Sequence, residues 1–95
     1  FFYRSKKSNR LFLIWSNFID GHGYSVLVRS SESGKLAGPW SKDEILFGKG
    51  GGHGMIFRDK DGKLFLTLHQ PNSTPNERMK LFRLEDDGQK LKIVK

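Results

Sequence analysis

Apolar runs of strand length, separated by turn residues, recur along the whole chain. Several runs are rich in Phe, Val and Ile, which favours β-strands. The runs cover residues 1–3, 11–15, 24–28, 36–40, 55–57, 64–68, 79–84 and 91–94. Asp-Gly pairs at 20–21, 61–62 and 87–88 predict tight hairpins, because the preferred two-residue turn needs positive φ. The pattern therefore predicts an all-β fold, in which 36–40 is a weak strand and 41–47 is a loop.

The second half of the chain repeats the first. Residues 3–6 match residues 57–60 at an offset of 54, and residues 10–15 match residues 63–68 at an offset of 53. Each copy holds four predicted strands in about 50 residues, the size and content of a β-propeller blade. We therefore predict two antiparallel four-stranded blades: one over residues 1–46, and the next over residues 47–95 with a Gly-rich loop at its start. Two tandem meanders that form a small sandwich are the alternative.

Two blades cannot close a propeller ring, because each blade buries its flat faces against its neighbours. We expect the bare faces to be covered by the remaining blades of a longer protein or by self-association. The chain also opens on Phe1-Phe2-Tyr3, inside a predicted strand, whereas natural termini are usually polar. This feature predicts that the chain begins within a longer protein.

The chain is strongly basic: 17 Lys and Arg stand against 10 Asp and Glu, a formal net charge of +7. Such a balance permits nucleic acid or acidic polymers as partners. Many of the cations, such as Lys6, Lys7 and Arg10, fall in predicted turns. We therefore predict that they are solvated and that the protein has no nucleic-acid partner. The alternative is a basic protein that binds nucleic acid. No apolar run approaches the ~20 residues of a membrane span, so no membrane partner is predicted. The absence of cysteine excludes a disulfide framework and a Cys-ligated zinc site.

The stretch Gly50-Gly51-Gly52-His53-Gly54 is the most unusual in the chain. Glycines at this density let the backbone turn sharply and approach another group closely. A phosphate-binding loop fits poorly, because the Lys-Ser/Thr pair is absent and a strand, not a helix, follows. The alternative is a flexible loop. In a propeller this loop would direct His53 towards the central axis.

Other candidate site residues are isolated along the sequence. No two histidines lie at the spacing of metal ligands, so we predict no zinc site, but His53 could supply one ligand to a hydrated ion. His69 ends a strand and is as consistent with a structural role as with a site role. Trp15 could stack on a sugar ring or pack in the core. Arg78 could fork onto sugar hydroxyls or pair with an acidic neighbour.

The acidic residues do not assemble a recognisable catalytic pair. Most of them fall in predicted turns, Glu85 and Asp86 included, and no Gly-x-Ser-x-Gly motif is present. The sequence also contains nothing that predicts an organic cofactor. We therefore predict no catalytic residue within this chain.

The motifs in this order resemble glycoside hydrolase family 43. In the second half the resemblance rests on 51–57, on 64–68 with the following His-Gln-Pro-Asn at 69–72, and on Glu77-Arg78. In the first half it rests on 13–18, Gly23-Tyr24 and Gly38-Pro39-Trp40. The family implies a five-bladed β-propeller, of which this chain would be the last two blades. It implies inverting hydrolysis of arabinose- or xylose-containing polysaccharide by two carboxyl groups.

The resemblance also implies roles for particular residues. The catalytic carboxylates would lie upstream of Phe1, so that the chain alone is expected to be inactive. His53 would bind a metal ion on the axis, often calcium through water, or touch the sugar. Arg78 would contact the substrate, although Met79 stands where many relatives have proline. Three further residues are candidate substrate-binding residues by their position alone: Trp15, Ser16 and His69. We expect a secreted or periplasmic glycosidase; a non-catalytic carbohydrate-binding propeller is the alternative.

Overall fold

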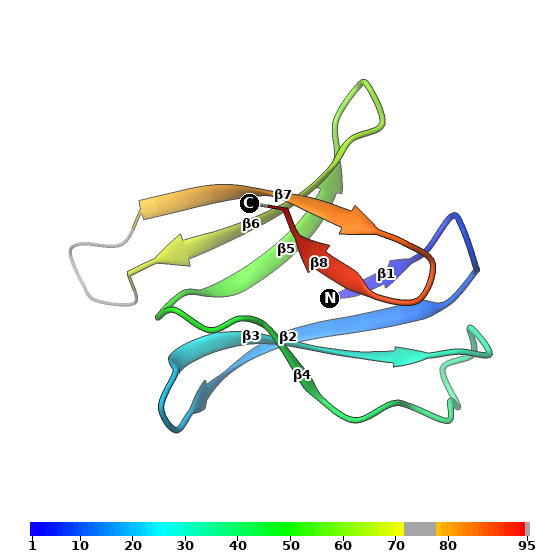
Figure 1. Ribbon diagram of the computed structural model, residues 1–95, viewed down its shortest axis with the longest axis horizontal. Coiled ribbons are helices and arrows are strands. Elements are labelled where there is room, and N and C mark those ends of the chain that lie inside the picture. Colours follow the sequence, from blue (N-terminus) through cyan, green and yellow to red (C-terminus); the bar gives the residue numbers. More distant parts are fainter. Residues whose placement is uncertain (72–77, 95) are drawn as a thin grey trace.

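The computed structural model describes residues 1–71 and 78–94, which form eight strands in two four-stranded antiparallel sheets (Figure 1). The first sheet contains β1 (Phe2–Arg4), β2 (Leu11–Ile19), β3 (Gly23–Ser31) and β4 (Glu44–Phe47). The second contains β5 (Gly52–Arg58), β6 (Leu64–Gln70), β7 (Arg78–Asp86) and β8 (Leu91–Ile93). Strands that follow one another in sequence are neighbours in each sheet, which is the arrangement of a propeller blade. The predicted all-β fold of two antiparallel four-stranded blades is confirmed.

Helices are absent from the part of the chain that the structure describes, so none there is long and apolar enough to cross a membrane.

The two sheets repeat each other in register as well as in sequence. Tyr3 pairs with Phe12 in the first sheet, and Phe57 pairs with Phe65 in the second. These pairs are related by the offsets of 54 and 53 residues found in the sequence. The β1–β2 turn is therefore one residue longer than the β5–β6 turn, as the sequence predicts.

The predicted fourth strand of the first sheet is wrong. Within 36–40 only Trp40 pairs, through an isolated bridge to Ser31, and the strand lies at Glu44–Phe47, where a loop is predicted. Gly38 has φ of 86°, and Pro39 has no N–H to donate, so this segment turns instead of forming a ladder. The apolar run that ends at Phe47 takes its place beside β3.

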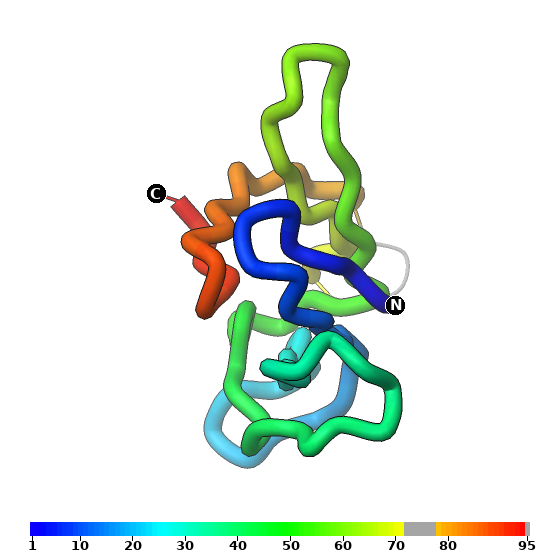
Figure 2. Tube along the Cα trace, turned by 90° about the vertical axis from the view of Figure 1, so that its right-hand side faces the viewer, coloured from blue at the N-terminus to red at the C-terminus, as the bar shows by residue number. Residues whose placement is uncertain are grey.

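The core lies between the two sheets, which face each other across a shared apolar layer (Figures 1 and 2). Its buried side chains include Phe12, Ile14, Val26 and Phe47 from the first sheet and Ile56, Leu66, Leu68 and Leu84 from the second. Burying one such side chain contributes about 1.5–3 kcal/mol. Because both sheets contribute to one core, each sheet depends on the other for its stability.

The glycines of β5 allow its backbone to lie directly against the first sheet. A Cβ on Gly52 would lie 2.0 Å from the ring of Tyr24, and a Cβ on Gly54 would lie 3.2 Å from Val26. A side chain at either position would push the sheets apart. The close approach expected from the glycine density is therefore an approach of strand to strand, not of backbone to a phosphate.

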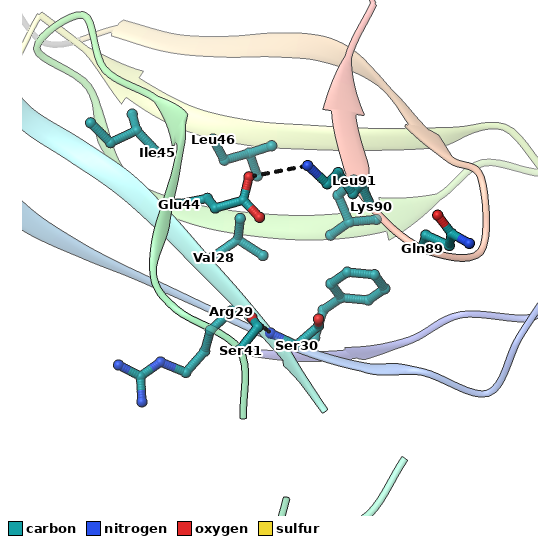
Figure 3. Close-up of a pocket in the computed structure, with 11 residues that line it drawn as sticks. Val28, Arg29, Ser30, Ser41, Glu44, Ile45, Leu46, Gln89, Lys90 and Leu91 are labelled. Carbon is teal, nitrogen blue, oxygen red and sulfur yellow. Dashed lines mark hydrogen bonds and ion pairs between the residues drawn. The ribbon is translucent and has the colours of Figure 1, made fainter. Parts of the chain in front are cut away.

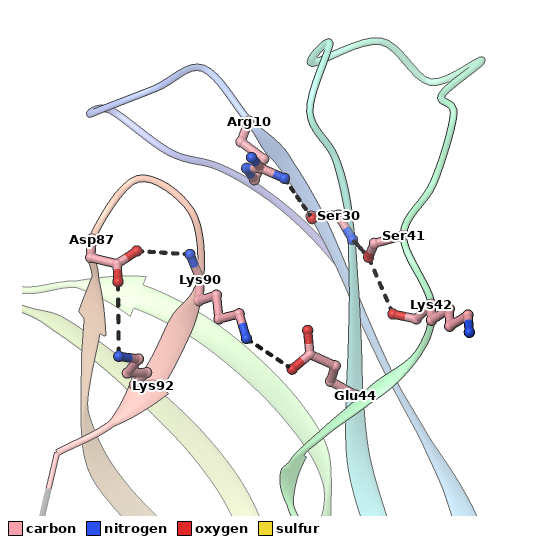
Figure 4. A network of polar contacts seen from close by, with 8 residues as sticks. All are labelled: Arg10, Ser30, Ser41, Lys42, Glu44, Asp87, Lys90 and Lys92. Atoms are coloured by element: carbon pink, nitrogen blue, oxygen red, sulfur yellow. Dashed lines mark hydrogen bonds and ion pairs between the residues drawn. The ribbon is translucent and has the colours of Figure 1, made fainter.

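The outer edge of the seam between the sheets is held by few polar contacts. Figures 3 and 4 show Glu44 of β4 reaching across to Lys90, just before β8, with 3.6 Å between the charged atoms. Both side chains are more than half exposed, so this ion pair contributes little to stability. Two hollows adjoin this pair: one of about 50 Å³, which is room for water rather than for a ligand, and a larger, open one of about 720 Å³ between β4 and β8.

The face of the second sheet that points away from the first is apolar and open. Met55, Phe57, Met79 and Leu81 are all at least 41% exposed, and Phe57 stacks on Phe65 at 5.5 Å. The corresponding face of the first sheet is partly covered, because segment 32–43 folds back over its end. There the rings of Phe2 and Trp40 lie 6.4 Å apart. Exposure on this scale is typical of a surface that meets another layer.

Tyr3 connects the two sheets through its hydroxyl, which donates to Asp86 at 2.9 Å and accepts from Arg58 at 2.9 Å. Burial, followed by the hydrogen bond to Asp86, raises the pKa of Tyr3 to about 12. The folded protein thus favours the neutral phenol. Its contribution to stability is complete below the ordinary pKa of 10.0 and is lost as the pH rises from there to about 12.

We therefore expect Tyr3→Phe to cost about 1 kcal/mol at neutral pH. The difference from the unsubstituted protein should shrink between pH 10 and 12, where ionisation favours the unfolded chain. Urea unfolding at pH 9 and at pH 11.5 tests this, and absorbance at 295 nm should lose its step near pH 12 in the variant. A stability difference that stays constant over this range would contradict the assignment.

Candidate functional site

One end of the seam gathers aromatic and imidazole rings from both sheets, a cluster that we call the ring shelf. It contains Phe18 of β2, Tyr24 of β3, His53 of β5 and His69 of β6. Successive ring centroids lie 4.9 Å apart from Phe18 to Tyr24, 5.9 Å from Tyr24 to His53 and 6.0 Å from His53 to His69. The rings thus form a continuous row across the junction of the two sheets.

The backbone at His53 holds its side chain at the start of β5. His53 has φ of 56°, in the left-handed region, and the β5–β6 register shifts between Gly52 and Met55. Its amide N–H donates to the hydroxyl of Ser16 across the seam at 2.9 Å. Non-glycine residues adopt this conformation rarely and at a cost, so the surrounding contacts must impose it.

The first-sheet half of the shelf follows from the β2–β3 hairpin. Phe18 pairs with Tyr24 across this hairpin, so the two side chains share a face and their rings meet. Phe18 is 68% exposed, Tyr24 is half-buried, and both imidazoles are exposed. The shelf therefore presents open ring faces together with imidazole nitrogens that can donate or accept hydrogen bonds. Such a surface suits a ligand with an apolar face and hydroxyl groups at its rim.

The structure brings Ser16, His53 and His69 together at the shelf. Arg78 begins β7 opposite Gln70, the neighbour of His69, and so lies at the same end of the second sheet. Asn72 and Glu77, which belong to the motifs of the sequence, lie outside the described residues.

Trp15 is not part of the shelf. It precedes Ser16 in β2, so its side chain is on the opposite face of the first sheet, away from the second. The guanidinium of Arg29 lies over its ring, 5.1 Å from the centroid. This contact uses the ring face that would otherwise be open to a sugar.

Sequence reasoning names neither Phe18 nor Tyr24 as a site residue. The signal was present in the Asp20-Gly21 turn, because a hairpin closed there pairs residue 18 with residue 24. What the turn does not reveal is that this face of β2 and β3 meets His53 of the second sheet. That contact depends on the packing of the two sheets.

Three carboxylates have partners away from the shelf, whereas Asp20 lies in the β2–β3 turn, close to the strand positions of Phe18 and Tyr24. Asp59 accepts two backbone N–H groups in the β5–β6 turn, Asp43 pairs with Arg29, and Asp86 accepts from Tyr3. Asp86 and Glu85 are residues of β7, so their prediction as turn residues is wrong. Over residues 1–71 and 78–94, no group of three or more His, Asp or Glu side chains is placed to hold a metal ion.

Comparison with known proteins identifies a structural relative of nearly the whole chain. The fold is similar to the crystal structure of an endo-arabinase from Bacteroides thetaiotaomicron, with a TM-score of 0.81 and 35% sequence identity. The match covers 93% of this chain and 31% of the endo-arabinase, so the chain spans about a third of that protein's length. No family model and no curated protein matches the sequence.

Proposed function

We propose that this chain forms two adjacent blades of a five-bladed propeller of the glycoside hydrolase family 43 type. In this proposal the whole protein hydrolyses arabinose- or xylose-containing polysaccharide with inversion of configuration. The observation that carries the proposal is the similarity to the endo-arabinase, at a TM-score of 0.81 and 35% identity over 93% of the chain. The motifs around His53 and His69 support it independently of the fold comparison.

In this function the ring shelf contacts the sugar. A pentose ring placed over Tyr24 would bring its hydroxyls towards His53 and His69, which are exposed on the shelf. Ser16 positions His53 by accepting its amide N–H. Arg78 supplies a cationic fork at the same end of the sheet. Trp15 has a different role, which is to pack towards the preceding blade on the other face of β2.

The chemical step requires groups from outside this chain. Inverting hydrolysis uses a carboxylic acid and a carboxylate about 6.5–9.5 Å apart, and the described carboxylates of this chain form no such pair at the shelf. We therefore place the acid and the base upstream of Phe1. The open apolar face of the second sheet then meets a further blade, or a second copy of the chain.

A calcium ion on the propeller axis fits the described residues only in part. Calcium takes 6–8 oxygen ligands, whereas the shelf offers imidazole nitrogens and the hydroxyls of Ser16 and Tyr24. His53 could supply one nitrogen, and water would supply most of the other ligands. In the proposed function such an ion would stabilise negative charge near the sugar, and the residues of this chain would only orient it.

The proposal is tested by assaying linear arabinan, nitrophenyl arabinofuranoside and nitrophenyl xyloside with the whole protein and with residues 1–95 alone. We expect the whole protein to release sugar and the 95-residue chain to release none. Turnover by the short chain would contradict the upstream placement of the carboxylates. Binding of arabinan by the whole protein without hydrolysis would favour the second candidate, a non-catalytic carbohydrate-binding propeller, which a shelf without carboxylates also suits.

A further inference from the structure

A second concave site lies at the opposite end of the seam from the ring shelf. It is a groove of about 210 Å³ between the β1–β2 turn and the ends of β5 and β7, which we call the hairpin groove. Its charged lining consists of Lys6, Lys7, Arg58, Arg83, Glu85 and Asp86. Figure 2 shows the β1–β2 turn beside the β7–β8 turn, and Ser8 of the first donates to the carbonyl of Gly88 in the second at 2.5 Å. The walls of the groove are thus fixed relative to each other.

Positive charge is in excess in the hairpin groove. Four cations face two carboxylates, and Asp86 already accepts the Tyr3 hydroxyl and the amide N–H of Gly88. Over the described ranges 1–71 and 78–94, none of the four cations lies within ion-pair distance of a carboxylate. Backbone N–H groups lower the pKa of the Asp87 carboxyl group, and Lys7 is near enough to help lower it. Unpaired like charges in one groove repel each other, and an anion bound between them would relieve that repulsion.

Arg58, which lines the groove, is held in one orientation by two hydrogen bonds within the protein. One terminal nitrogen donates to the carbonyl of Gly62 at 2.8 Å, and the other donates to the Tyr3 hydroxyl at 2.9 Å. These two bonds use two of the five guanidinium N–H groups and leave others to donate. A fork held in this way loses little side-chain entropy when it binds a carboxylate.

The lining favours a carboxylated sugar over a nucleic acid. Proteins that hold single-stranded nucleic acid stack its bases on exposed aromatic rings. Among the described residues that line the groove, Tyr3 alone is aromatic, and it is partly buried with its hydroxyl engaged. The volume is below the ~300 Å³ typical of sites for drug-sized ligands, which suits one sugar unit at a time. We propose that the hairpin groove binds a uronic acid unit of an acidic polysaccharide.

This inference rests on the proposed function, because it assumes that the ring shelf handles a neutral sugar polymer. A protein with both sites would hold an acidic stretch of a polysaccharide in the hairpin groove and a neutral pentose stretch on the shelf. The net charge of +7 would assist this by attracting the acidic polymer over a longer range.

The test measures binding of trigalacturonate to the whole protein by isothermal titration calorimetry in about 50 mM salt, where exposed charges are weakly screened. Neutral arabinotriose and a short oligothymidylate are the comparison ligands. We compare the double variant Lys6→Gln/Arg83→Gln with the control Lys42→Gln/Lys80→Gln. Both pairs remove two exposed positive charges, but only the first pair lines the groove. Circular dichroism confirms that each variant is folded.

We expect trigalacturonate to bind in the millimolar range and the groove variant to weaken it about tenfold, the effect of losing about 1.4 kcal/mol. The control should change binding less than about twofold, since neither Lys42 nor Lys80 lines the groove. Equal weakening by both variants, or no binding at all, would overturn the proposal. Tighter binding of oligothymidylate that only the groove variant abolishes would assign the groove to nucleic acid instead.

The two proposals can fail separately. If the whole protein hydrolyses arabinan but does not bind trigalacturonate, only the proposed role of the hairpin groove is wrong. If the whole protein binds trigalacturonate but neither binds nor hydrolyses arabinan, the proposed function of the ring shelf is wrong instead.

Discussion

Gly51→Ala is expected to destabilise the protein by about 3 kcal/mol, the upper end for overpacking a closed core. Gly51 is buried in the connection between β4 of the first sheet and β5 of the second, and an added Cβ would meet atoms of three residues. It would lie 2.8 Å from Leu68 Cδ1, 2.9 Å from Phe47 Cε2 and 2.9 Å from the carbonyl oxygen of His69. Side chains can shift by a few tenths of an ångström, but the carbonyl belongs to a strand ladder and cannot.

Gly50→Ala is the matched control, one residue away. Gly50 has φ of 76° and nothing within 4 Å of an added Cβ, so its replacement carries conformational strain without a clash. We expect a loss of about 1 kcal/mol there. Urea unfolding of both variants, followed by tryptophan fluorescence, separates the two effects. If the variants lose equal stability, the close packing of β5 against β4 and β6 is not what requires glycine at position 51.

In the whole protein, His53→Asn is expected to lower kcat/KM for arabinan about 100-fold, equivalent to about 2.7 kcal/mol, if the ring shelf contacts the substrate. Asparagine tolerates the left-handed φ of 56° at this position and keeps the amide N–H that donates to Ser16. The variant therefore removes the imidazole and its contacts with Tyr24 and His69 but preserves the backbone. The melting temperature of the whole protein should stay within about 2 °C, which corresponds to less than about 1 kcal/mol.

His22→Asn controls for the loss of an imidazole from the same end of the molecule. His22 lies in the turn between β2 and β3 and has no ring contact with the row from Phe18 to His69 among the described residues. We expect its activity to remain within about twofold, since a difference of that size is below 0.5 kcal/mol. Equal activity of the two variants would place the substrate away from the shelf.

The success and the failure of strand prediction have different physical causes. The runs around Leu66 and Val26 alternate or are continuously apolar, and Asp-Gly turns delimit several of them, so local pattern was enough to identify these strands. The region 36–47 failed because two segments competed for the edge of β3. The segment that can form a hydrogen-bonded ladder with β3 takes this edge. Residues 36–40 cannot, because Pro39 has no N–H to donate, so residues 44–47 pair with β3 instead.

The candidate site shows the same division. His53 could be identified because glycines surround it, and the repeat placed it at the start of the second sheet. Alternation along β2 places Trp15 and Ser16 on opposite faces, but it does not say which face meets the second sheet. Packing decided that Ser16 faces His53 and that Trp15 faces Arg29.

By itself the sequence determined the fold class, the twofold repeat of a four-stranded unit and the Asp-Gly turns, because these depend on residues close together in the chain. Tertiary structure alone decided that β5 lies against β3, that Tyr24 joins the imidazoles, and that the cations of two hairpins line one groove. The physical reason is the separation along the chain over which each interaction acts. Strand and turn preferences act between near neighbours, whereas the shelf and the hairpin groove each join residues more than 25 positions apart, which only the shared core between the sheets brings together.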